Sequence, residues 1–277
     1  MIIIVLGSRG MAGHTITHYF KEFTSHITIG IARELADHNI DIEYNLSYLE
    51  HLIENYKPDI IINCIGLLIK NCNERPDKAI YINSFFPHWL EKIAEKTNTK
   101  IIHLSTNCIF KETLGNYLDT DIPDGDTWYA KTKAMGEITN NKDLTIRLSI
   151  IGNELKENGS GLFGWFMKQK GKIDGYSECY WNGITTLCLA QNLEKIIETN
   201  ITGLYQLAPG YNIDKYSLCQ LFKKVWNKQD IIITPNDSVK KNGTLINSYR
   251  KNFQPIFPIN YEQMLIEMKE FMEKENG

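Results

Sequence analysis

The start of the chain places a strand, a glycine-rich turn and a helix in direct succession. Residues 2–6 are a continuous apolar run rich in β-branched residues, which is typical of a strand buried on both faces of a parallel sheet. The turn over residues 7–13 has the spacing G-x-x-G-x-x-G, and an apolar helical pattern follows. Such glycines permit a tight turn and let a pyrophosphate approach the backbone at a helix N-terminus. The segment therefore predicts a dinucleotide-binding unit.

Strands and helices continue to alternate up to about residue 152. This alternation predicts βαβ units, and hence an α/β protein with a doubly wound parallel sheet of Rossmann type. We expect an NAD(P)-binding domain over residues 1–152. Its further strands are expected at residues 27–31, 58–66, 100–110 and 144–152, and its helices at 48–56, at 76–96 with a break near Pro87, and from 129 onward.

The end of the second predicted strand bears on the choice of cofactor. An NAD-selective site usually carries an acidic residue there to bind the ribose 2′-hydroxyl, whereas an arginine accommodates a 2′-phosphate. No acid stands at residues 30–33, and Arg9 and Arg33 are both available. The pattern favours NADP, with NAD as the alternative. Two exposed arginines without a role in binding would explain the same pattern.

Two later strands end in small and polar residues. Asn63, Cys64, Ile65 and Gly66 follow one strand, and hydroxyl residues close the strand that begins at Lys100. Ligands of doubly wound sheets bind outside the carboxyl ends of the strands. These segments are therefore expected beside the cofactor.

Tyr129 and Lys133 are four residues apart in a predicted helix, so they lie on one face. A cation beside a phenol favours the phenolate and lowers the tyrosine pKa. Such a tyrosine can exchange a proton with a reacting oxygen near neutral pH. The alternative interpretation is an ordinary solvated helix face.

After Gly152 the sequence becomes rich in glycine and aromatic residues up to about residue 183. Aromatic side chains with a polar edge suit a sugar or a base, and they equally suit the core of a small domain. We expect residues 153–277 to form a smaller, mainly substrate-binding part, with about 184–209 packing back on the first domain. Its regular elements are expected at 184–199, 203–207, 214–227 and 261–275.

Composition excludes several classes of protein. The formal net charge of −3 offers no basic field for nucleic acid, and no apolar run approaches the ~20 residues of a membrane span. The N-terminus lacks the basic region and cleavage site of a signal peptide. None of the six cysteines forms a C-x-x-C pair, so we expect no metal site, and we expect a reducing cytoplasmic location.

Taken together, these motifs resemble the extended short-chain dehydrogenase/reductase superfamily, and within it the dTDP-4-dehydrorhamnose reductase family. The resemblance covers most of the chain and is strongest over residues 1–152. It rests on the glycine turn, the segment after the strand at 58–66, Asn83 in the next helix, the segment Leu104-Ser105-Thr106-Asn107-Cys108-Ile109-Phe110, the pair Tyr129 and Lys133, and Arg147-Leu148-Ser149. Asn107 and Cys108 replace the usual Asp and Tyr, which leaves the sugar open.

The resemblance implies a role for each matched residue. The implied catalytic residues are Thr106, Tyr129 and Lys133, whereas Ser105 is disfavoured because strand alternation turns it to the other face. The candidate substrate residues are Asn107 and Ser149, from the resemblance, and Trp181, from the aromatic-rich segment. The candidate cofactor residues are Arg9 and Arg33, from the missing acid after the second strand, together with Gly7, Gly10, Met11, Gly13, Cys64, Ile65, Gly66, Asn83, Tyr129 and Lys133.

The implied activity is NADPH-dependent reduction of the 4-keto group of a nucleotide-activated 6-deoxyhexose, as in cell-surface polysaccharide biosynthesis. Tyr129 would protonate the developing alkoxide, Thr106 would hydrogen-bond the same oxygen, and Lys133 would also hold the nicotinamide ribose. Two alternatives stay open: a nucleotide-sugar epimerase or dehydratase on the same scaffold, and a non-catalytic NADP-binding regulatory subunit. The expected partner is the nucleotide sugar, and a homodimer is left open.

Overall fold

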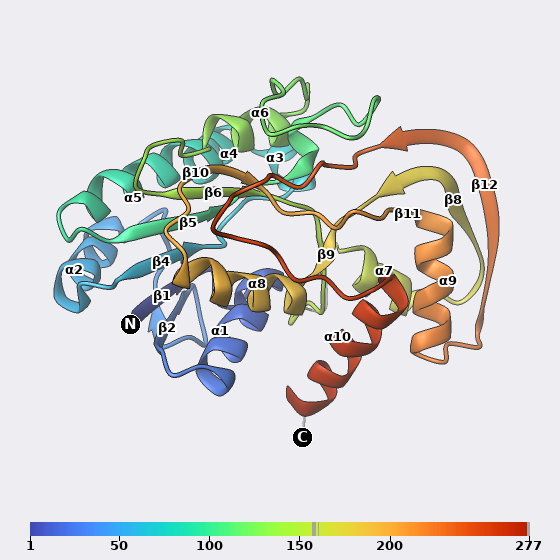
Figure 1. The fold of residues 1–277 in the computed structure, drawn as a ribbon, viewed down its shortest axis with the longest axis horizontal. Coiled ribbons are helices and arrows are strands. Elements are labelled where there is room, and N and C mark those ends of the chain that lie inside the picture. Colours follow the sequence, from blue (N-terminus) through green and yellow to red (C-terminus); the bar gives the residue numbers. More distant parts are fainter. Residues whose placement is uncertain (157–158, 160, 276–277) are drawn as a thin grey trace. The chain divides into compact units, whose positions relative to one another are not determined.

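The computed structural model describes residues 1–156, 159 and 161–275. The chain divides into two compact units, each described here by itself (Figure 1). The first unit contains Met1–Phe110, Ile122–Arg147 and Asn200–Tyr205. The second contains Lys111–Asp121, Leu148–Thr199 and the chain from Gln206 onward. The change of unit after Arg147 therefore precedes the boundary expected at residue 152, and within 184–209 only Asn200–Tyr205 belong to the first unit.

A seven-stranded sheet forms the centre of the first unit. Its order is β10-β6-β5-β4-β1-β2-β3, and the pairs from β3 to β6 are parallel. The chain leaves β1 toward β2 and later returns to β4 on its other side, which is the switch point where doubly wound sheets bind ligands. The predicted Rossmann-type α/β fold is confirmed. The strands are β1 (Ile2–Leu6), β2 (Ile27–Ala32), β3 (His38–Asn39), β4 (Ile60–Asn63), β5 (Lys100–Leu104), β6 (Leu144–Arg147) and β10 (Gly203–Gln206).

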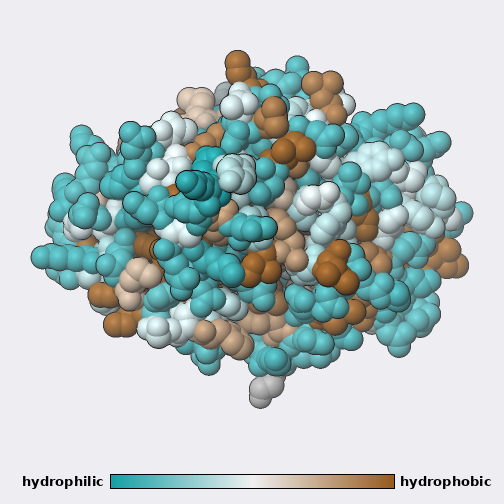
Figure 2. All heavy atoms as spheres, in the orientation of Figure 1, coloured by the Kyte–Doolittle hydropathy of each residue, from teal (hydrophilic) through white to brown (hydrophobic). Residues whose placement is uncertain are grey.

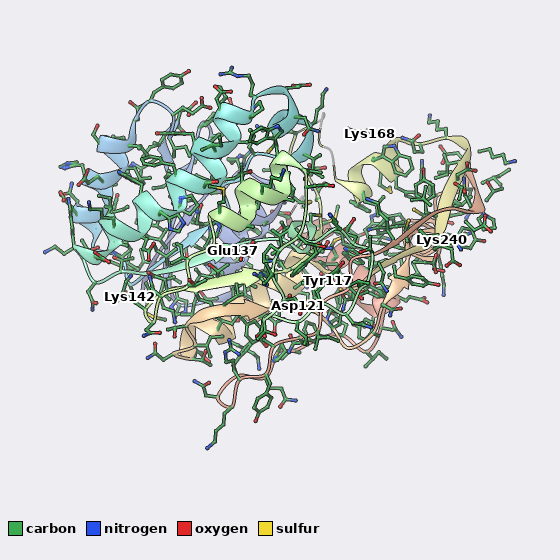
Figure 3. All side chains as sticks on the ribbon, turned by 90° about the horizontal axis from the view of Figure 1, so that it is seen from above. Tyr117, Asp121, Glu137, Lys142, Lys168 and Lys240 are labelled. Atoms are coloured by element: carbon green, nitrogen blue, oxygen red, sulfur yellow. The ribbon has the colours of Figure 1, made fainter. Side chains whose placement is uncertain are left out.

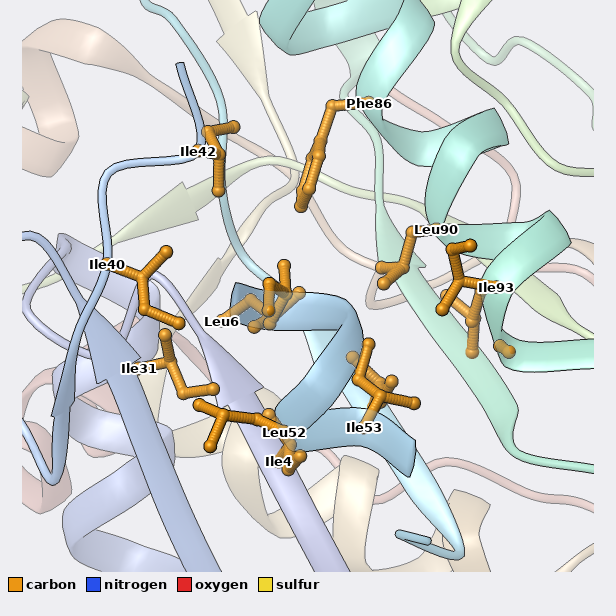
Figure 4. Packing of buried hydrophobic residues seen from close by; sticks show 14 of the residues in the cluster. Ile4, Leu6, Ile31, Ile40, Ile42, Leu52, Ile53, Phe86, Leu90 and Ile93 are labelled. Atoms are coloured by element: carbon orange, nitrogen blue, oxygen red, sulfur yellow. The ribbon is translucent and has the colours of Figure 1, made fainter. Parts of the chain in front are cut away.

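Apolar side chains cover both faces of this sheet. Ile4 and Leu6 of β1 belong to a buried cluster with residues of α2 and α5, among them Leu52 and Phe86 (Figure 4). Residues alternate across a strand, so Ile3, which is also fully buried, lies on the opposite face. Helix α1 contacts β1 and β2. Burial on both faces explains why β1 is apolar throughout rather than alternating.

The helical segments of the first unit are α1 (Met11–Phe23), α2 (Leu46–Tyr56), α3 (Ile69–Glu74), α4 (Pro76–Ala79), the π-helix η1 (Ile80–Phe85), α5 (Phe86–Glu95), the short 3₁₀ helix η2 (Asn107–Ile109) and α6 (Trp128–Met135). The backbone stays helical near the break expected at Pro87, but the type of helix changes there, from the π-helix η1 to α5 at Phe86. Pro87 has no N–H to continue the helical hydrogen bonds, which explains why the change falls at this point.

The second unit contains a three-stranded sheet of order β11-β8-β12 and a two-stranded sheet of β7 and β9. The strand expected at 144–152 is instead divided between β6 and β7. The long strands β8 and β12 were not predicted, because polar residues interrupt both sequences and many of their side chains are exposed. The elements are β7 (Ile150–Ile151), α7 (Leu162–Lys168), β8 (Gly171–Trp181), β9 (Ile184–Thr185), α8 (Thr186–Glu198), β11 (Ile213–Asp214), α9 (Lys215–Val225), β12 (Ile231–Asn242) and α10 (Tyr261–Glu275).

The surface drawn in Figure 2 is mainly hydrophilic, with hydrophobic side chains scattered among polar ones. Within residues 1–156, 159 and 161–275, every helix is too short or too polar to cross a membrane. The same residues hold no group of three or more His, Cys, Asp or Glu placed to bind a metal ion.

Candidate active site

The glycine turn forms a compact cradle between β1 and α1. Gly7 has a φ of +79°, a conformation that favours glycine. Its N–H and that of Ser8 donate to the carbonyl of Ile31 at 2.8 and 3.1 Å, and the Gly10 N–H donates to the Gly7 carbonyl at 2.8 Å. A Cβ at Gly13 would overlap the Gly7 carbonyl, so α1 packs closely under the turn. The spacing read from the sequence thus corresponds to steric need at Gly7 and Gly13.

The N-terminus of α1 suits an anion. Gly10 is the N-cap residue, Met11 opens the helix, and no side chain of the described residues caps it. The first turn has no acidic residue, so the helix dipole and backbone N–H groups face the turn uncompensated. A Cβ at Gly7 would lie 3.2 Å from both Cys64 and Ile65, which brings the segment after β4 against the turn. This cradle fits the pyrophosphate of NADP or NAD.

The end of β2 carries the two candidate arginines. Arg33 is exposed and Arg9 is partly exposed. The nearby carboxylate of Asp37 is already bound, since it accepts from Lys21 Nζ at 2.7 and 2.9 Å and from the Gly30 N–H at 2.7 Å. With Asp37 engaged, Arg9 and Arg33 remain available for a 2′-phosphate, while the exposed carboxylate of Glu34 directly follows Arg33.

Helix α6 presents Tyr129 and Lys133 and is anchored at its N-terminus. Thr127 caps the helix by accepting from the Ala130 N–H at 3.0 Å. The Ser84 hydroxyl donates to the Thr132 carbonyl at 2.8 Å. These bonds fix α6 against η1, a π-helix of the kind that often occurs at functional sites.

Asn83, in η1, is fully buried and its amide is used completely. Its Oδ1 accepts from the Leu67 N–H at 2.7 Å, while Nδ2 donates to the Leu67 carbonyl at 3.1 Å and to Thr132 Oγ1 at 3.2 Å. A Cβ at Gly136 would overlap the Asn83 carbonyl, so glycine lets α6 approach this point. Asn83 therefore holds both α6 and the loop next to Gly66 in place, at the edge of the sheet where the cofactor is expected.

Thr106 and Tyr129 share a side-chain hydrogen bond. Thr106 Oγ1 also accepts from the Cys108 N–H at 3.1 Å, which orients the hydroxyl at the end of β5. The neighbouring Ser105 hydroxyl instead donates to Glu137 Oε1 at 2.7 Å. The expectation that strand alternation turns Ser105 away is confirmed.

Lys133 does not act on Tyr129 as expected. Burial raises the pKa of Tyr129 well above its ordinary value, and the bond from Thr106 only partly opposes this. Lys133 Nζ donates to the Leu104 carbonyl at 2.7 Å, and burial lowers the pKa of Lys133 to about 8. The predicted lowering of the Tyr129 pKa by Lys133 is therefore wrong for this structure. Desolvation outweighs any attraction, and Tyr129 keeps its proton at neutral pH.

A buried ion pair that the sequence analysis missed supports the same helix. Arg147 Nε and Nη2 donate to the two oxygens of Glu137 at 2.9 and 2.8 Å, and both side chains are nearly inaccessible (Figure 3 labels Glu137). The guanidinium also lies 5.4 Å from the centre of the Phe110 ring. The pair joins the end of α6 to β6. Its sequence signal was weak, because a glutamate four residues after Lys133 resembles an ordinary helix surface.

Among the candidate substrate residues, Asn107 is buried in the first unit, whereas Ser149 and Trp181 lie in the second. Trp181 is 4% exposed, and its Nε1 donates to Ser149 Oγ at 2.5 Å. Its ring lies 5.5 Å from that of Tyr261 and 4.8 Å from Lys215 Nζ. These contacts favour the core alternative for Trp181.

Other aromatic residues of the expected pocket segment keep exposed faces. Trp165, Tyr176 and Tyr180 are 41%, 42% and 38% exposed. The two tyrosines share one face of β8, opposite Trp181. Residues 157–158 and 160 of this segment lie outside the described residues. The exposed aromatics are thus better placed than Trp181 to meet a ligand.

The fold and this set of side chains define an extended short-chain dehydrogenase/reductase. The family model described as RmlD substrate binding domain matches residues 1–243, and the chain belongs to that family. The predicted resemblance to dTDP-4-dehydrorhamnose reductases is confirmed.

Known proteins of several kinds are similar to the chain. It is 27% identical over 163 residues to the probable low-salt glycan biosynthesis reductase Agl14 of Haloferax volcanii, covering 54% of each protein. It is 22% identical over 230 residues to methionine adenosyltransferase 2 subunit beta of Xenopus tropicalis, covering 78% of this chain and 69% of that protein. The structure of a dTDP-4-dehydrorhamnose reductase from Bacillus anthracis in complex with NADP superposes with a TM-score of 0.80 at 17% identity, over 98% of this chain and 99% of that one.

Proposed function

We propose that the chain is an NADPH-dependent reductase of the 4-keto group of a nucleotide-activated 6-deoxyhexose. The observation that carries this proposal is the hydrogen-bonded pair of Thr106, which follows β5, and Tyr129 of α6. Reduction of a ketone needs a proton donor, and a tyrosine hydroxyl held by a neighbouring hydroxyl can supply that proton. The glycine cradle in the same unit supplies the second requirement, a site for the cofactor.

Each residue has a defined task in the proposed reaction. The turn of Gly7 and Gly10 and the N-terminus of α1 bind the pyrophosphate, and Arg9 and Arg33 take the 2′-phosphate. Bound NADPH supplies the hydride. Tyr129 gives its proton to the oxygen that gains charge, and the Thr106 hydroxyl stabilises the same oxygen.

Lys133 would turn from the Leu104 carbonyl to the nicotinamide ribose when the cofactor binds. Ile65 and Gly66, in the loop positioned by Asn83, would border the same ribose. We further propose that the second unit has a mainly substrate-binding role.

The names of the similar proteins support the substrate class. One structure is a dTDP-4-dehydrorhamnose reductase with NADP, and one relative is a probable glycan biosynthesis reductase. We therefore place the reaction in the biosynthesis of a cell-surface polysaccharide. NADP is the proposed cofactor, and NAD is the alternative.

Two other functions use the same scaffold. An epimerase or dehydratase uses the same tyrosine as a base during its cycle and regenerates its nicotinamide cofactor, so it consumes no net NADPH. A regulatory subunit has support from two relatives, each named as subunit beta of methionine adenosyltransferase 2. A subunit that only binds NADP has no use for a proton donor, so the bond between Thr106 and Tyr129 favours the enzyme.

A single assay separates the three functions. Purified protein is mixed with NADPH and a panel of keto-sugar nucleotides, and the absorbance of NADPH is followed together with product analysis. Stoichiometric oxidation of NADPH supports reduction, and product without net oxidation supports epimerisation. Binding of NADPH without turnover on any sugar would contradict the proposal and favour the regulatory subunit.

We also propose that the protein works in a reducing cytoplasm, supported by six cysteines that are all free thiols. The homodimer left open by the sequence is tested by analytical ultracentrifugation. A measured mass of 32.0 kDa, which is that of a single chain, would exclude the homodimer.

A further inference from the structure

His103 is a fully buried histidine that the proposed reaction does not use. It lies in β5, directly before Leu104, and its neighbour across the sheet is Asn63 of β4. The Nδ1 atom of its ring is 3.0 Å from Asn63 Nδ2, and its Nε2 atom is 3.5 Å from Lys133 Nζ. The ring thus connects a buried amide to the lysine of the candidate site.

A backbone group determines the direction of these hydrogen bonds. The Ile65 N–H can only donate, and it lies 3.1 Å from Asn63 Oδ1. Oδ1 is therefore the oxygen of the amide, and Nδ2 is the donor that faces His103. Because Nδ2 donates, Nδ1 of the ring must accept, and the proton of the neutral ring is on Nε2.

The Nε2–H of His103 then points toward Lys133. An ammonium group has no lone pair to accept this hydrogen, whereas an uncharged amine has one. Lys133 meanwhile donates to the Leu104 carbonyl at 2.7 Å, which either form can do. These hydrogen bonds form a series from Ile65 through Asn63, His103 and Lys133 to Leu104. Every donor in the series has an acceptor only when Lys133 is an uncharged amine.

We propose that His103 is a positioning residue for Lys133, and that its ring, oriented by Asn63, holds the lysine beside the Leu104 carbonyl and stabilises its uncharged form. The catalytic meaning of this inference rests on the proposed function, because Lys133 takes part in catalysis only if the protein is a reductase.

The groups around the two residues agree with this arrangement. Burial is the main cause that lowers the pKa of His103 well below its ordinary value, so the ring is neutral. Burial is also the main cause of the lowered Lys133 pKa, while Glu137, Cys64 and Cys72 oppose it. Burial thus brings the pKa of Lys133 to about 8, within the pH range in which its titration can be followed.

The test measures the titration of Lys133 directly. Protein labelled with ¹³C-lysine is titrated by NMR without cofactor or substrate, and the Lys133 signal is identified by its loss in Lys133→Met. In the parent protein we expect a midpoint near pH 8. Lys100, which donates to the Ile201 carbonyl, serves as an internal reference that must not move.

Three variants test the role of the ring. His103→Phe removes the donor, so the midpoint rises by about one pH unit, the worth of a typical neutral hydrogen bond. Asn63→Leu frees the ring to present Nε2 as an acceptor, and the midpoint rises as well. In His103→Gln, the amide oxygen of the glutamine can accept in place of the ring Nδ1, and its amide nitrogen can donate in place of the ring Nε2. The midpoint should therefore stay near the parent value.

An unchanged midpoint in both His103→Phe and Asn63→Leu would overturn the proposal. A shift in His103→Gln as large as in His103→Phe would also overturn it, because the loss would then concern packing and not the donor. The readout needs no substrate, so a protein without reductase activity would refute the proposed function while leaving this result to stand or fall separately.

Discussion

The surroundings of Tyr129 in the first unit and of Trp181 in the second differ in how much of the packing is aromatic. Around Tyr129, polar groups have specific partners, as Asn83 has in Leu67 and Thr132. Around Trp181, large rings pack on one another, and hydrogen bonds from Trp181 to Ser149 and from Tyr261 to the Gly183 carbonyl fix the edges of the rings. Losing one atom should therefore change chemistry in the first region, whereas stability in the second depends on how much area is buried.

The sharpest test of this contrast is Tyr129→Phe. The change deletes one hydroxyl, so turnover should fall roughly 10²–10⁴-fold while cofactor binding survives. Steady-state kinetics and NADPH titration measure the two effects. Tyr249→Phe, which removes the hydroxyl of a tyrosine that is 83% exposed, is the matched control and should keep the parent rate. A Tyr129→Phe protein with near-parent turnover would show that another group delivers the proton.

Trp181→Ala probes the second region. Removing a buried tryptophan should lower the free energy of unfolding by roughly 3–5 kcal/mol. Tyr180→Ala, whose side chain is on the other face of the same strand, should change it by less than about 0.5 kcal/mol. Urea unfolding of both variants gives the comparison. If Trp181→Ala unfolds like the parent but raises KM, the ring lines the substrate site and the core assignment is wrong.

Lys133→Met tests whether burial of the charged form of Lys133 lowers the free energy of unfolding. The pKa of Lys133 is about 8 in the folded protein and 10.5 when unperturbed. Between these pH values the unfolded chain binds a proton that the folded chain lacks, so this group makes the parent more stable as pH rises from 8 to 10.5.

The variant has no such group. Its stability relative to the parent should therefore decrease with pH across that window, by on the order of 3 kcal/mol. Urea unfolding at pH 7 and pH 10.5 measures the difference. Lys131→Met, exposed on the same helix, is the control and should show no such trend. A pH-independent difference for Lys133→Met would mean that Lys133 is not destabilised by burial.

The smallest effect concerns the cofactor. Charge-assisted hydrogen bonds from Arg9 or Arg33 to a 2′-phosphate are worth about 1.5–3 kcal/mol each, so NADPH should bind about tenfold to a hundredfold more tightly than NADH. Calorimetric titration with both cofactors measures this ratio, and Arg33→Ala should reduce it. Arg75→Ala, at a surface pair with Asp77, is the control. Equal affinities for NADPH and NADH would show that these arginines do not bind the 2′-phosphate.

Local patterns sufficed wherever a residue acts through its own backbone or its near neighbours. The apolar run of β1 and the glycines that follow predicted the cradle, because close packing under a turn demands residues without a Cβ. The spacing of Tyr129 and Lys133 placed both on α6. The alternation along β5 correctly separated Thr106 from Ser105.

The sequence by itself determined the Rossmann-type sheet, the glycine cradle and the candidate residues, because strand and helix periodicity and glycine sterics are local. Only the tertiary structure decided how those residues behave. Lys133 is oriented by Leu104 and His103, and the pKa of Tyr129 is set by burial, which depends on what distant segments cover it. The sequence likewise allowed Trp181 to line a pocket or to belong to the core, and the packing of its ring on Tyr261 of α10 favours the core. Hydrogen bonding and desolvation between distant segments carry no local signature, so sequence spacing could not supply them.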